Sequence, residues 1–333
     1  MKKNIAIVTG GAGFIGSHMC DLLIKKKFEV RIIDNLSGGH IKNINHHSKT
    51  EKLKLYNYDI TKIKPNNKIF KDVKFIFHFA GKGDIVPSIE RPNDYILDNV
   101  IGTSNILECA RNNNIKKFIY AASSSCYGLA KTPTKETNDI NPMYPYALSK
   151  NMGEQLVLHW GKLYNLPVVS VRIFNAYGTR VRTTGAYGAV FGVFFKQLLM
   201  GKPFTIVGNG NQKRDFIYVT DLVDAFYKLA MSNANMEVYN VGAGIPQSIN
   251  KLVNIIDSQN KIVYLPNRPG EPDTTWADIS KIQNKINWKP KINFEKGIKL
   301  MLEEINNWKD APLWDVKKIN NATKTWFEYM SKF

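Results

Sequence analysis

Short apolar runs alternate with longer stretches of helical periodicity along the first half of the chain. The runs predict strands at 5–8, 29–34, 52–58, 74–80, 117–122 and 167–175, and the periodic stretches predict helices at 14–27, 98–114 and 143–165. The strands are rich in β-branched residues, as expected where both faces of a parallel sheet are covered by helices. The pattern therefore predicts an α/β fold of the Rossmann type, with a doubly wound parallel sheet.

The pattern changes after residue 176. A loop at 178–189 is rich in Gly, Thr and Arg, and the segment 204–219 predicts a strand, a turn at Asn209-Gly210 and a second strand. Periodic stretches predict helices at 190–202, 219–232, 248–258, 293–309 and 316–331. We expect two interleaved domains: 1–176 with a returning segment at about 215–241, and a smaller, mostly helical domain at 177–333.

Composition narrows the class of protein. Of the 333 residues, 44% are hydrophobic and 22% charged, as in ordinary globular proteins. The net charge of +18 is compatible with a polyanionic partner, but the basic residues are spread along the whole chain rather than gathered in one stripe. We therefore expect no nucleic-acid partner, and we expect some basic residues to meet a phosphorylated small substrate.

Three further expectations concern location and metals. No apolar stretch approaches the length of a membrane span, so no membrane association is expected. Cys20, Cys109 and Cys126 are odd in number and far apart, which favours a reducing cytoplasm over a disulfide framework. His46 and His47 are adjacent in a polar loop, and no Cys or His pair has the spacing of metal ligands, so no metal site is predicted.

A glycine-rich segment, TGGAGFIG (9–16), lies between the first predicted strand and the first predicted helix. Gly10, Gly13 and Gly16 allow a tight turn and a close approach of the backbone to a pyrophosphate. The unpaired N–H groups and the dipole at the helix N-terminus favour that negative charge. Phe14 and Ile15 lie within the same segment, which predicts a dinucleotide site.

The second predicted strand ends in Asp34, where a carboxylate can accept hydrogen bonds from the adenosine ribose and would repel a 2′-phosphate. Asn35 follows, rather than the arginine that an NADP site would favour, so we predict NAD although Arg31 is near. Asp59 and Ile60 follow the third strand and are placed to meet the adenine ring. A simple cap at the end of that strand is an equally good explanation of Asp59.

Tyr146 and Lys150 form a YxxxK pattern within a predicted helix, where positions i and i+4 share one face. A free tyrosine has a pKa near 10, and a neighbouring ammonium group would favour the phenolate. Tyr146 could then take a proton from a substrate hydroxyl. The segment AASSSCYG (121–128) places three serines at the end of the strand that precedes this helix.

Taken together, these motifs resemble the extended short-chain dehydrogenase/reductase family, and within it the nucleotide-sugar epimerases and dehydratases. The resemblance covers roughly residues 4–310 and includes DNVIGT, YALSK, RIFNAYG, GNGNQKRDFIYVTD, YNVGAG, RPGEPD and WADISKIQNKINWKP. It implies that Ser123, Tyr146 and Lys150 are catalytic. It also implies contacts with the cofactor from residues around the glycine segment and the following strands, among them Phe79, Ala80, Gly81 and Asn99.

Ser124 and Ser125 distinguish between dehydration and epimerisation, the two main reactions that the resemblance allows. The 4,6-dehydratases of the family carry Asp and Glu in these places, and a serine is a poor acid or base at neutral pH. The resemblance therefore implies an NAD-dependent epimerase that acts at C4 of a UDP-hexose or UDP-N-acetylhexosamine through a 4-keto intermediate. A 4,6-dehydratase, a 4-dehydrogenase and a protein that senses dinucleotides without turnover remain as alternatives.

The resemblance also implies a substrate site. Arg214 and Arg268 would meet the diphosphate, Glu271 the nucleoside ribose, and Asn175 the diphosphate or the sugar. Thr275 falls where the family controls the size of the hexose, and a small residue there would leave room for an N-acetyl group. Arg182 is a further candidate for binding an anion. Family habit and the helices at 98–114 and 143–165 imply a homodimer.

Overall fold

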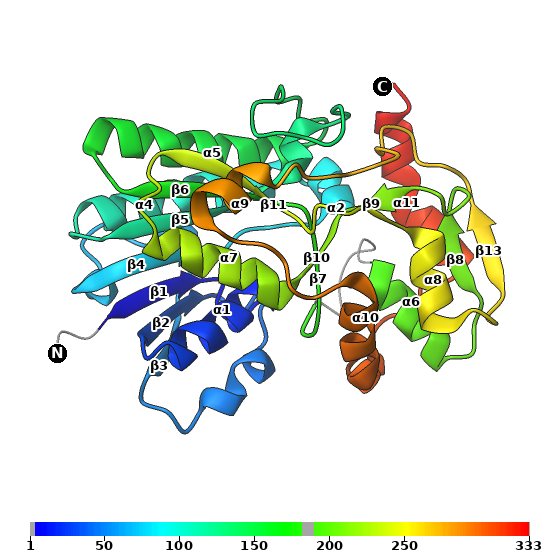
Figure 1. The fold of residues 1–333 in the computed structure, drawn as a ribbon, viewed down its shortest axis with the longest axis horizontal. Coiled ribbons are helices and arrows are strands. Elements are labelled where there is room, and N and C mark those ends of the chain that lie inside the picture. Colours follow the sequence, from blue (N-terminus) through cyan, green and yellow to red (C-terminus); the bar gives the residue numbers. More distant parts are fainter. Residues whose placement is uncertain (1–3, 182–189, 333) are drawn as a thin grey trace.

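A seven-stranded parallel sheet forms the centre of the computed structural model, which describes residues 4–181 and 190–332 (Figure 1). In spatial order its strands are β11 (Glu237–Val241), β6 (Val168–Ile173), β5 (Lys117–Ser123), β4 (Val73–His78), β1 (Ile5–Thr9), β2 (Glu29–Asp34) and β3 (Leu53–Asn57). The order reverses between β1 and β4, so the carboxyl ends of these strands form the crevice where doubly wound folds bind ligands. The α/β fold predicted from the sequence is confirmed. Arg182 lies outside the described residues.

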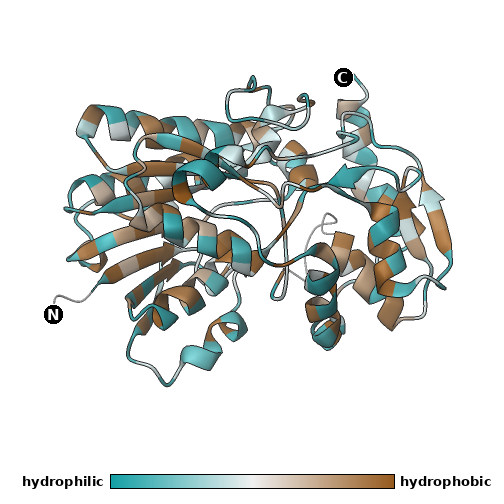
Figure 2. Cartoon of the chain, viewed as in Figure 1, coloured by the Kyte–Doolittle hydropathy of each residue, from teal (hydrophilic) through white to brown (hydrophobic). Residues whose placement is uncertain are grey.

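Helices cover both faces of the sheet. On one face, the apolar sides of α1 (Phe14–Lys25), α7 (Val219–Met231) and α9 (Ser280–Ile286) share a core cluster with alternate residues of the strands. On the other face, α4 (Gly102–Arg111) and α5 (Pro145–Tyr164) do the same. Figure 2 shows the strands between these layers as mostly hydrophobic. Burial on both faces explains why the strands are continuous apolar runs.

The helix predicted at 98–114 has an earlier and less regular beginning. After the short helix α2 (Ile85–Glu90), α3 (Pro92–Ile96) begins with a proline in its first turn, where a missing N–H costs nothing. A single π-helical turn, Leu97–Ile101, joins α3 to α4. This turn contains Asn99, one of the residues expected at the cofactor site.

The second half of the chain builds a smaller lobe around its own core cluster. The helices of this lobe are α6 (Val190–Leu199), α8 (Ile249–Asp257) and α10 (Phe294–Glu303). Its strands form parallel pairs β7 (Asn175–Tyr177) with β10 (Phe216–Tyr218) and β8 (Phe204–Val207) with β13 (Ile262–Leu265), and an antiparallel pair β9 (Lys213–Arg214) with β12 (Gln247–Ser248). The lobe is mostly helical and also contains these short pairs of strands.

The predicted strand, turn and strand at 204–219 form, but the two strands do not pair with each other. β8 pairs instead with β13. Gly208 and Gly210 take positive φ angles in the turn that leads from β8 to β9 (Lys213–Arg214). A Cβ atom on Gly210 would lie 2.0 Å from the side-chain oxygen of Asn250 in α8. The Asn209-Gly210 turn thus lies against α8 and leads from β8 to β9, rather than closing a hairpin.

The C-terminal helix α11 (Val316–Met330) packs on α2 through Trp326, Met330 and Val86. The helix predicted at 293–309 is α10 followed by a 3-10 turn, and it places Trp308 in the core. The other 3-10 turns are Ile41–Asn43, Asn45–His47, Ile60–Lys62, Lys68–Phe70 and Ser124–Tyr127. Within the described ranges, no helix is both long and apolar enough to cross the hydrocarbon layer of a membrane.

Candidate active site

The glycine segment forms a tight cradle between β1 and α1. Gly10 has a φ of +67°, and a Cβ atom there would lie 2.8 Å from the backbone nitrogen of Ala80. A Cβ on Gly16 would lie 2.1 Å from the carbonyl oxygen of Gly10. Gly13 caps α1, whose first residues are Phe14 and Ile15. Gly10 and Gly16 leave no room for a Cβ atom, and the helix N-terminus beside them suits a pyrophosphate.

Asp34 lies beside this cradle at the end of β2. Its carboxylate accepts hydrogen bonds from the backbone nitrogens of Ala12, at 2.9 Å, and Leu36, at 2.8 Å. These bonds fix the carboxylate and leave it lone pairs for the hydroxyls of a ribose. Arg31 donates instead to the carbonyl oxygens of Ile69 and Lys71. The arginine that could have met a 2′-phosphate is thus engaged elsewhere, which fits NAD.

Asn35 and Asp59 have local roles in addition to the expected contact with the adenosine. The side-chain oxygen of Asn35 accepts from the backbone and hydroxyl groups of Ser37. Asp59 accepts from Thr61 and caps a 3-10 turn, so the simple cap that the sequence allowed is present. Burial alone would raise the pKa of Asp59, but the hydrogen bonds from Thr61 and Asn35 bring it below its usual value. Ile60 is buried beside α4.

The segment after β4 carries three of the residues that the resemblance implies at the cofactor site. Phe79 and Ala80 donate backbone hydrogen bonds to Thr9, at the end of β1, which holds this segment against the glycine cradle. Gly81 has a φ of +153°, and a Cβ there would lie 2.4 Å from the side-chain oxygen of Asn99. The neighbouring Lys82 forms an ion pair with Asp98 at 2.9 Å.

Asn99 uses its side chain to join two elements of the site. Its amide accepts from the backbone nitrogen of Lys82 and donates to the Lys82 carbonyl, and it also donates to the hydroxyl of Ser149 in α5. Ser149 lies one residue before Lys150. Asn99 therefore positions the segment at 81–82 relative to α5, whatever contact it makes with the cofactor.

The structure brings Ser123 and Tyr146 together. Ser123 ends β5, and it shares a hydrogen bond with the phenol of Tyr146 in the first turn of α5. Burial raises the pKa of Tyr146, the hydrogen bond with Ser123 lowers it, and the nearby carboxylate of Asp84 raises it. The phenol is thus a weak acid in the protein itself, so a positive charge is needed to form the phenolate at neutral pH.

Lys150 lies one turn further along α5 and is buried. Its Nζ is 4.5 Å from the centre of the Tyr120 ring, in a cation–π contact. Burial lowers the pKa of Lys150 to about 7, and the carboxylate of Glu154 opposes this effect. The ammonium is therefore held in an apolar site with one carboxylate near it, on the helix that carries Tyr146.

Two contributors were missed from the sequence. Glu154, one helical turn after Lys150, binds the guanidinium of Arg172 at 2.6 Å and accepts from Ser170 at 2.7 Å. Glu154 lies four residues after Lys150, and this i, i+4 spacing could have indicated that the two share one face of the helix. Tyr144 stacks with the Tyr146 ring, at 6.4 Å between centroids, and shares a hydrogen bond with Ser125. No sequence pattern marked Tyr144.

The expected substrate residues also lie together. Arg214 is buried and donates to a carboxylate oxygen of Glu271 at 2.7 Å, while Arg268 lies 3.8 Å from the other oxygen. The hydroxyl of Thr275 donates to the side-chain oxygen of Asn175 at 2.7 Å. Two guanidinium groups around one carboxylate form a site whose positive charge exceeds its negative charge, as a diphosphate would require.

Tyr144 and α11 connect this cluster to Ser123 and Tyr146. The charges of Glu271 and Arg214 affect the pKa of the Tyr144 phenol, and Tyr144 stacks with Tyr146. Tyr144 therefore links the cluster around Glu271 to Tyr146. Trp326 of α11 donates its indole N–H to the carbonyl oxygen of Pro269 and contacts Tyr144. The C-terminal helix thus supports the loop that carries Arg268 and Glu271, a role that its sequence did not indicate.

Comparisons with known proteins agree with this geometry. The family model of the NAD dependent epimerase/dehydratase family matches residues 6–242. A Methanocaldococcus jannaschii protein provisionally named UDP-glucose 4-epimerase is 37% identical over 90% of this chain and 98% of its own length.

Two solved structures are similar along their whole length. The UDP-N-acetylglucosamine 4-epimerase of Methanobrevibacter ruminantium, in complex with UDP-N-acetylmuramic acid, has a TM-score of 0.85 and 35% identity, over 91% of this chain and 100% of that one. The UDP-glucuronic acid 4-epimerase of Bacillus cereus, in complex with UDP-glucuronic acid and NAD, has a TM-score of 0.84 and 30% identity, over 91% and 99%. The chain belongs to the NAD dependent epimerase/dehydratase family.

Proposed function

We propose that the protein interconverts UDP-hexoses or UDP-N-acetylhexosamines that differ in configuration at C4, through a 4-keto intermediate. The observation that carries the proposal is the pairing of Ser123 with Tyr146 on the strand end where Ser124 and Ser125 replace the acid–base pair of a dehydratase. The similarity to 4-epimerases of three UDP-sugars supports it.

The glycine cradle and Asp34 fit NAD, which when bound supplies reversible hydride transfer at the sugar carbon. We assign the proton transfer to Tyr146, whose phenolate accepts the proton of the C4 hydroxyl and later returns it. Ser123 donates a hydrogen bond to the same oxygen. Lys150 supplies the positive charge that favours the phenolate against the burial that raises the pKa of Tyr146. One oxidation and one reduction leave the product with the substrate's composition.

The substrate would lie between the catalytic residues and the small lobe. Arg214 and Arg268 are assigned to the diphosphate, since each offers a planar set of donors to phosphate oxygens. Glu271 would then exchange one arginine contact for the hydroxyls of the nucleoside ribose. Thr275 and Asn175, which share a hydrogen bond, are assigned to the sugar side. A side chain as short as Thr275 leaves room for an N-acetyl group.

The experiment is a panel of UDP-, GDP-, CDP- and dTDP-sugars incubated with the purified protein. Product mass separates the alternatives, because dehydration removes one water, oxidation removes two hydrogens and epimerisation changes nothing. We expect an epimer of unchanged mass from at least one UDP-sugar. A product that has lost water identifies a 4,6-dehydratase, a released keto-sugar identifies a 4-dehydrogenase, and bound NAD without turnover supports a sensing protein.

We further propose a homodimer whose interface is formed by α5 and the helical stretch from α3 to α4. Leu97, Ile101 and Leu148 are 44–48% exposed on these elements, and Leu97 and Ile101 are one helical turn apart. Such a group of apolar side chains is typical of an interface. Analytical ultracentrifugation of the protein and of Ile101→Glu tests this: the charge should yield monomers, and a wild-type monomer would contradict the proposal.

A cytoplasmic location is proposed from the cysteines. Cys20, Cys109 and Cys126 are free and buried in the described structure, as expected where thiols stay reduced. A fluorescent fusion or cell fractionation of the source organism tests this, and recovery in an extracytoplasmic fraction would contradict it.

A further inference from the structure

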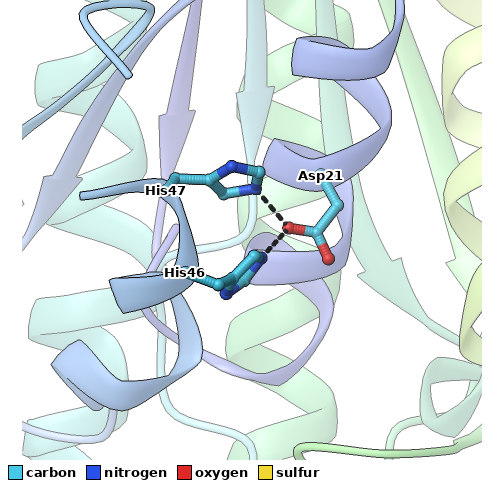
Figure 3. A group of neighbouring side chains, drawn as sticks. All are labelled: Asp21, His46 and His47. Carbon is cyan, nitrogen blue, oxygen red and sulfur yellow. Dashed lines mark hydrogen bonds and ion pairs between the residues drawn. The ribbon is translucent and has the colours of Figure 1, made fainter. Parts of the chain in front are cut away.

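Three side chains that can bind a metal meet on the outer side of α1 (Figure 3). Asp21 projects from α1, and His46 and His47 project from the 3-10 turn Asn45–His47. The Nε2 atoms of His46 and His47 lie 2.8 and 2.7 Å from the same oxygen of Asp21. All three candidate ligand atoms lie within 4.8 Å of one another. Sequence spacing gave no sign of this group, because Asp21 is 25 residues from His46.

The charges around the group leave one carboxylate oxygen for a cation. The guanidinium of Arg180 binds the other oxygen of Asp21 at 2.8 Å. Burial alone would raise the pKa of Asp21, but Arg180 and the hydrogen bonds from the two histidines bring it below its usual value, so the carboxylate is ionised. His18 lies on the same helix three residues before Asp21, and burial lowers its pKa to about 4, which keeps it neutral.

We propose that Asp21, His46 and His47 form a binding site for one transition-metal dication, with Zn²⁺ the best match. Two imidazole nitrogens and one carboxylate oxygen are ligands that Zn²⁺ prefers, and a water would complete a tetrahedral shell. Zn–N and Zn–O bonds of about 2.0–2.1 Å place tetrahedral ligands about 3.3 Å apart. The two contacts to Asp21 would therefore lengthen by about half an ångström, and each histidine would present its Nε2 lone pair, with the proton on Nδ1. Magnesium and calcium, which prefer oxygen ligands, are poor matches.

The position of the site suggests what the metal would do. The segment that carries the histidines is already tied to the glycine cradle, because the backbone of His40 and the side chain of Asn43 both donate to the carbonyl oxygen of Ala12. Asp21 lies on the helix that this cradle begins. A metal between Asp21 and the histidines would lock this segment onto α1 behind the expected dinucleotide site. Its role would be structural, and it would take no part in the sugar chemistry.

Zinc titration of the tag-free protein, stripped with a chelator and followed by calorimetry, tests the proposal. We expect one Zn²⁺ per chain, an affinity at least tenfold weaker in His46→Ala and in His47→Gln, and no change in His159→Ala, whose histidine is exposed on α5. Zinc should also raise the melting temperature of the wild type and of His159→Ala, but not that of the other two variants.

Cobalt provides a second measurement that does not depend on stability. Co²⁺ bound in four-coordinate geometry gives strong visible absorption, whereas the hexa-aqua ion absorbs weakly. We expect this absorption in the wild type and its loss in His46→Ala. The proposal is overturned if the wild type binds no Zn²⁺, or if one-to-one binding survives unchanged in both His46→Ala and His47→Gln. Circular dichroism of each variant establishes that it is folded.

Discussion

Glu154→Gln removes the negative charge from a buried ion pair between α5 and β6. Glu154 and Arg172 have side chains that are 4% and 7% exposed, and their closest atoms are 2.6 Å apart. Arg172 donates two further bonds to the same carboxylate, at 3.1 and 3.2 Å, and Ser170 donates a fourth. The glutamine keeps the shape of the side chain but leaves the guanidinium buried without a counter-charge.

Breaking a buried pair from one side costs about 3–5 kcal/mol, because the remaining charge has lost its compensation. Arg172 keeps a hydrogen bond to the hydroxyl of Tyr127 and one to the carbonyl of Glu136. We therefore expect the free energy of unfolding to fall by about 3 kcal/mol, the lower end of this range. This is a large part of the stability of a typical domain.

Urea unfolding, followed by circular dichroism at one fixed protein concentration, measures the loss. The chain offers a matched control in Glu295→Gln, since Glu295 pairs with Lys251 at the same distance of 2.6 Å but with side chains that are 46% and 43% exposed. An exposed pair contributes at most about 1 kcal/mol. If both variants lost the same free energy of unfolding, the argument that burial makes the Glu154–Arg172 pair more stabilising than an exposed pair would be refuted.

The same substitution should alter the pH dependence of turnover. Burial lowers the pKa of Lys150 to about 7 and Glu154 opposes that effect, so Glu154→Gln lowers the pKa of Lys150 further. The ammonium is then lost at a lower pH, and the alkaline limb of the kcat profile should move to lower pH. If the alkaline limb of the kcat profile stays at the same pH in Glu154→Gln, Glu154 has no electrostatic influence on Lys150.

Three further predictions concern the site itself. Gly16→Ala should abolish NAD binding in a fluorescence titration, because its Cβ would lie 2.1 Å from the Gly10 carbonyl oxygen; Gly38→Ala, with nothing within 4 Å of its Cβ, should bind normally. Tyr146→Phe should abolish turnover and keep NAD binding, and near-normal turnover would remove Tyr146 from its role. Thr275→Tyr should reduce activity on N-acetylhexosamines relative to hexoses by about tenfold or more, measured as the ratio of kcat/KM values. An unchanged ratio would show that Thr275 does not control the size of the sugar.

The features that the sequence predicted well are local or periodic. The apolar runs of the parallel strands, the glycine segment and the i, i+4 spacing of Tyr146 and Lys150 each depend on neighbours along the chain, so a single sequence carries them. Arg214, Arg268 and Glu271 were named only through a family resemblance, and the structure brings them together.

The features that the sequence did not predict mostly depend on contacts between segments that are far apart in the sequence. β8 pairs with β13 across 57 residues of chain, so the Asn209-Gly210 turn gave a misleading signal for local pairing. The π-helical turn at Leu97–Ile101 contains no proline or glycine that would mark it in the sequence. The meeting of Asp21 with the two histidines depends on how α1 packs beside the turn at Asn45–His47, which no periodicity encodes.

The most direct test of the central claim is a proton NMR time course of the purified protein with each UDP-sugar of the panel. The account predicts that the signals of one substrate convert to those of its C4 epimer until an equilibrium mixture is reached, with no keto product and no net change in bound NAD. A dehydrated or oxidised product, or no epimer from any UDP-sugar despite bound NAD, would contradict it.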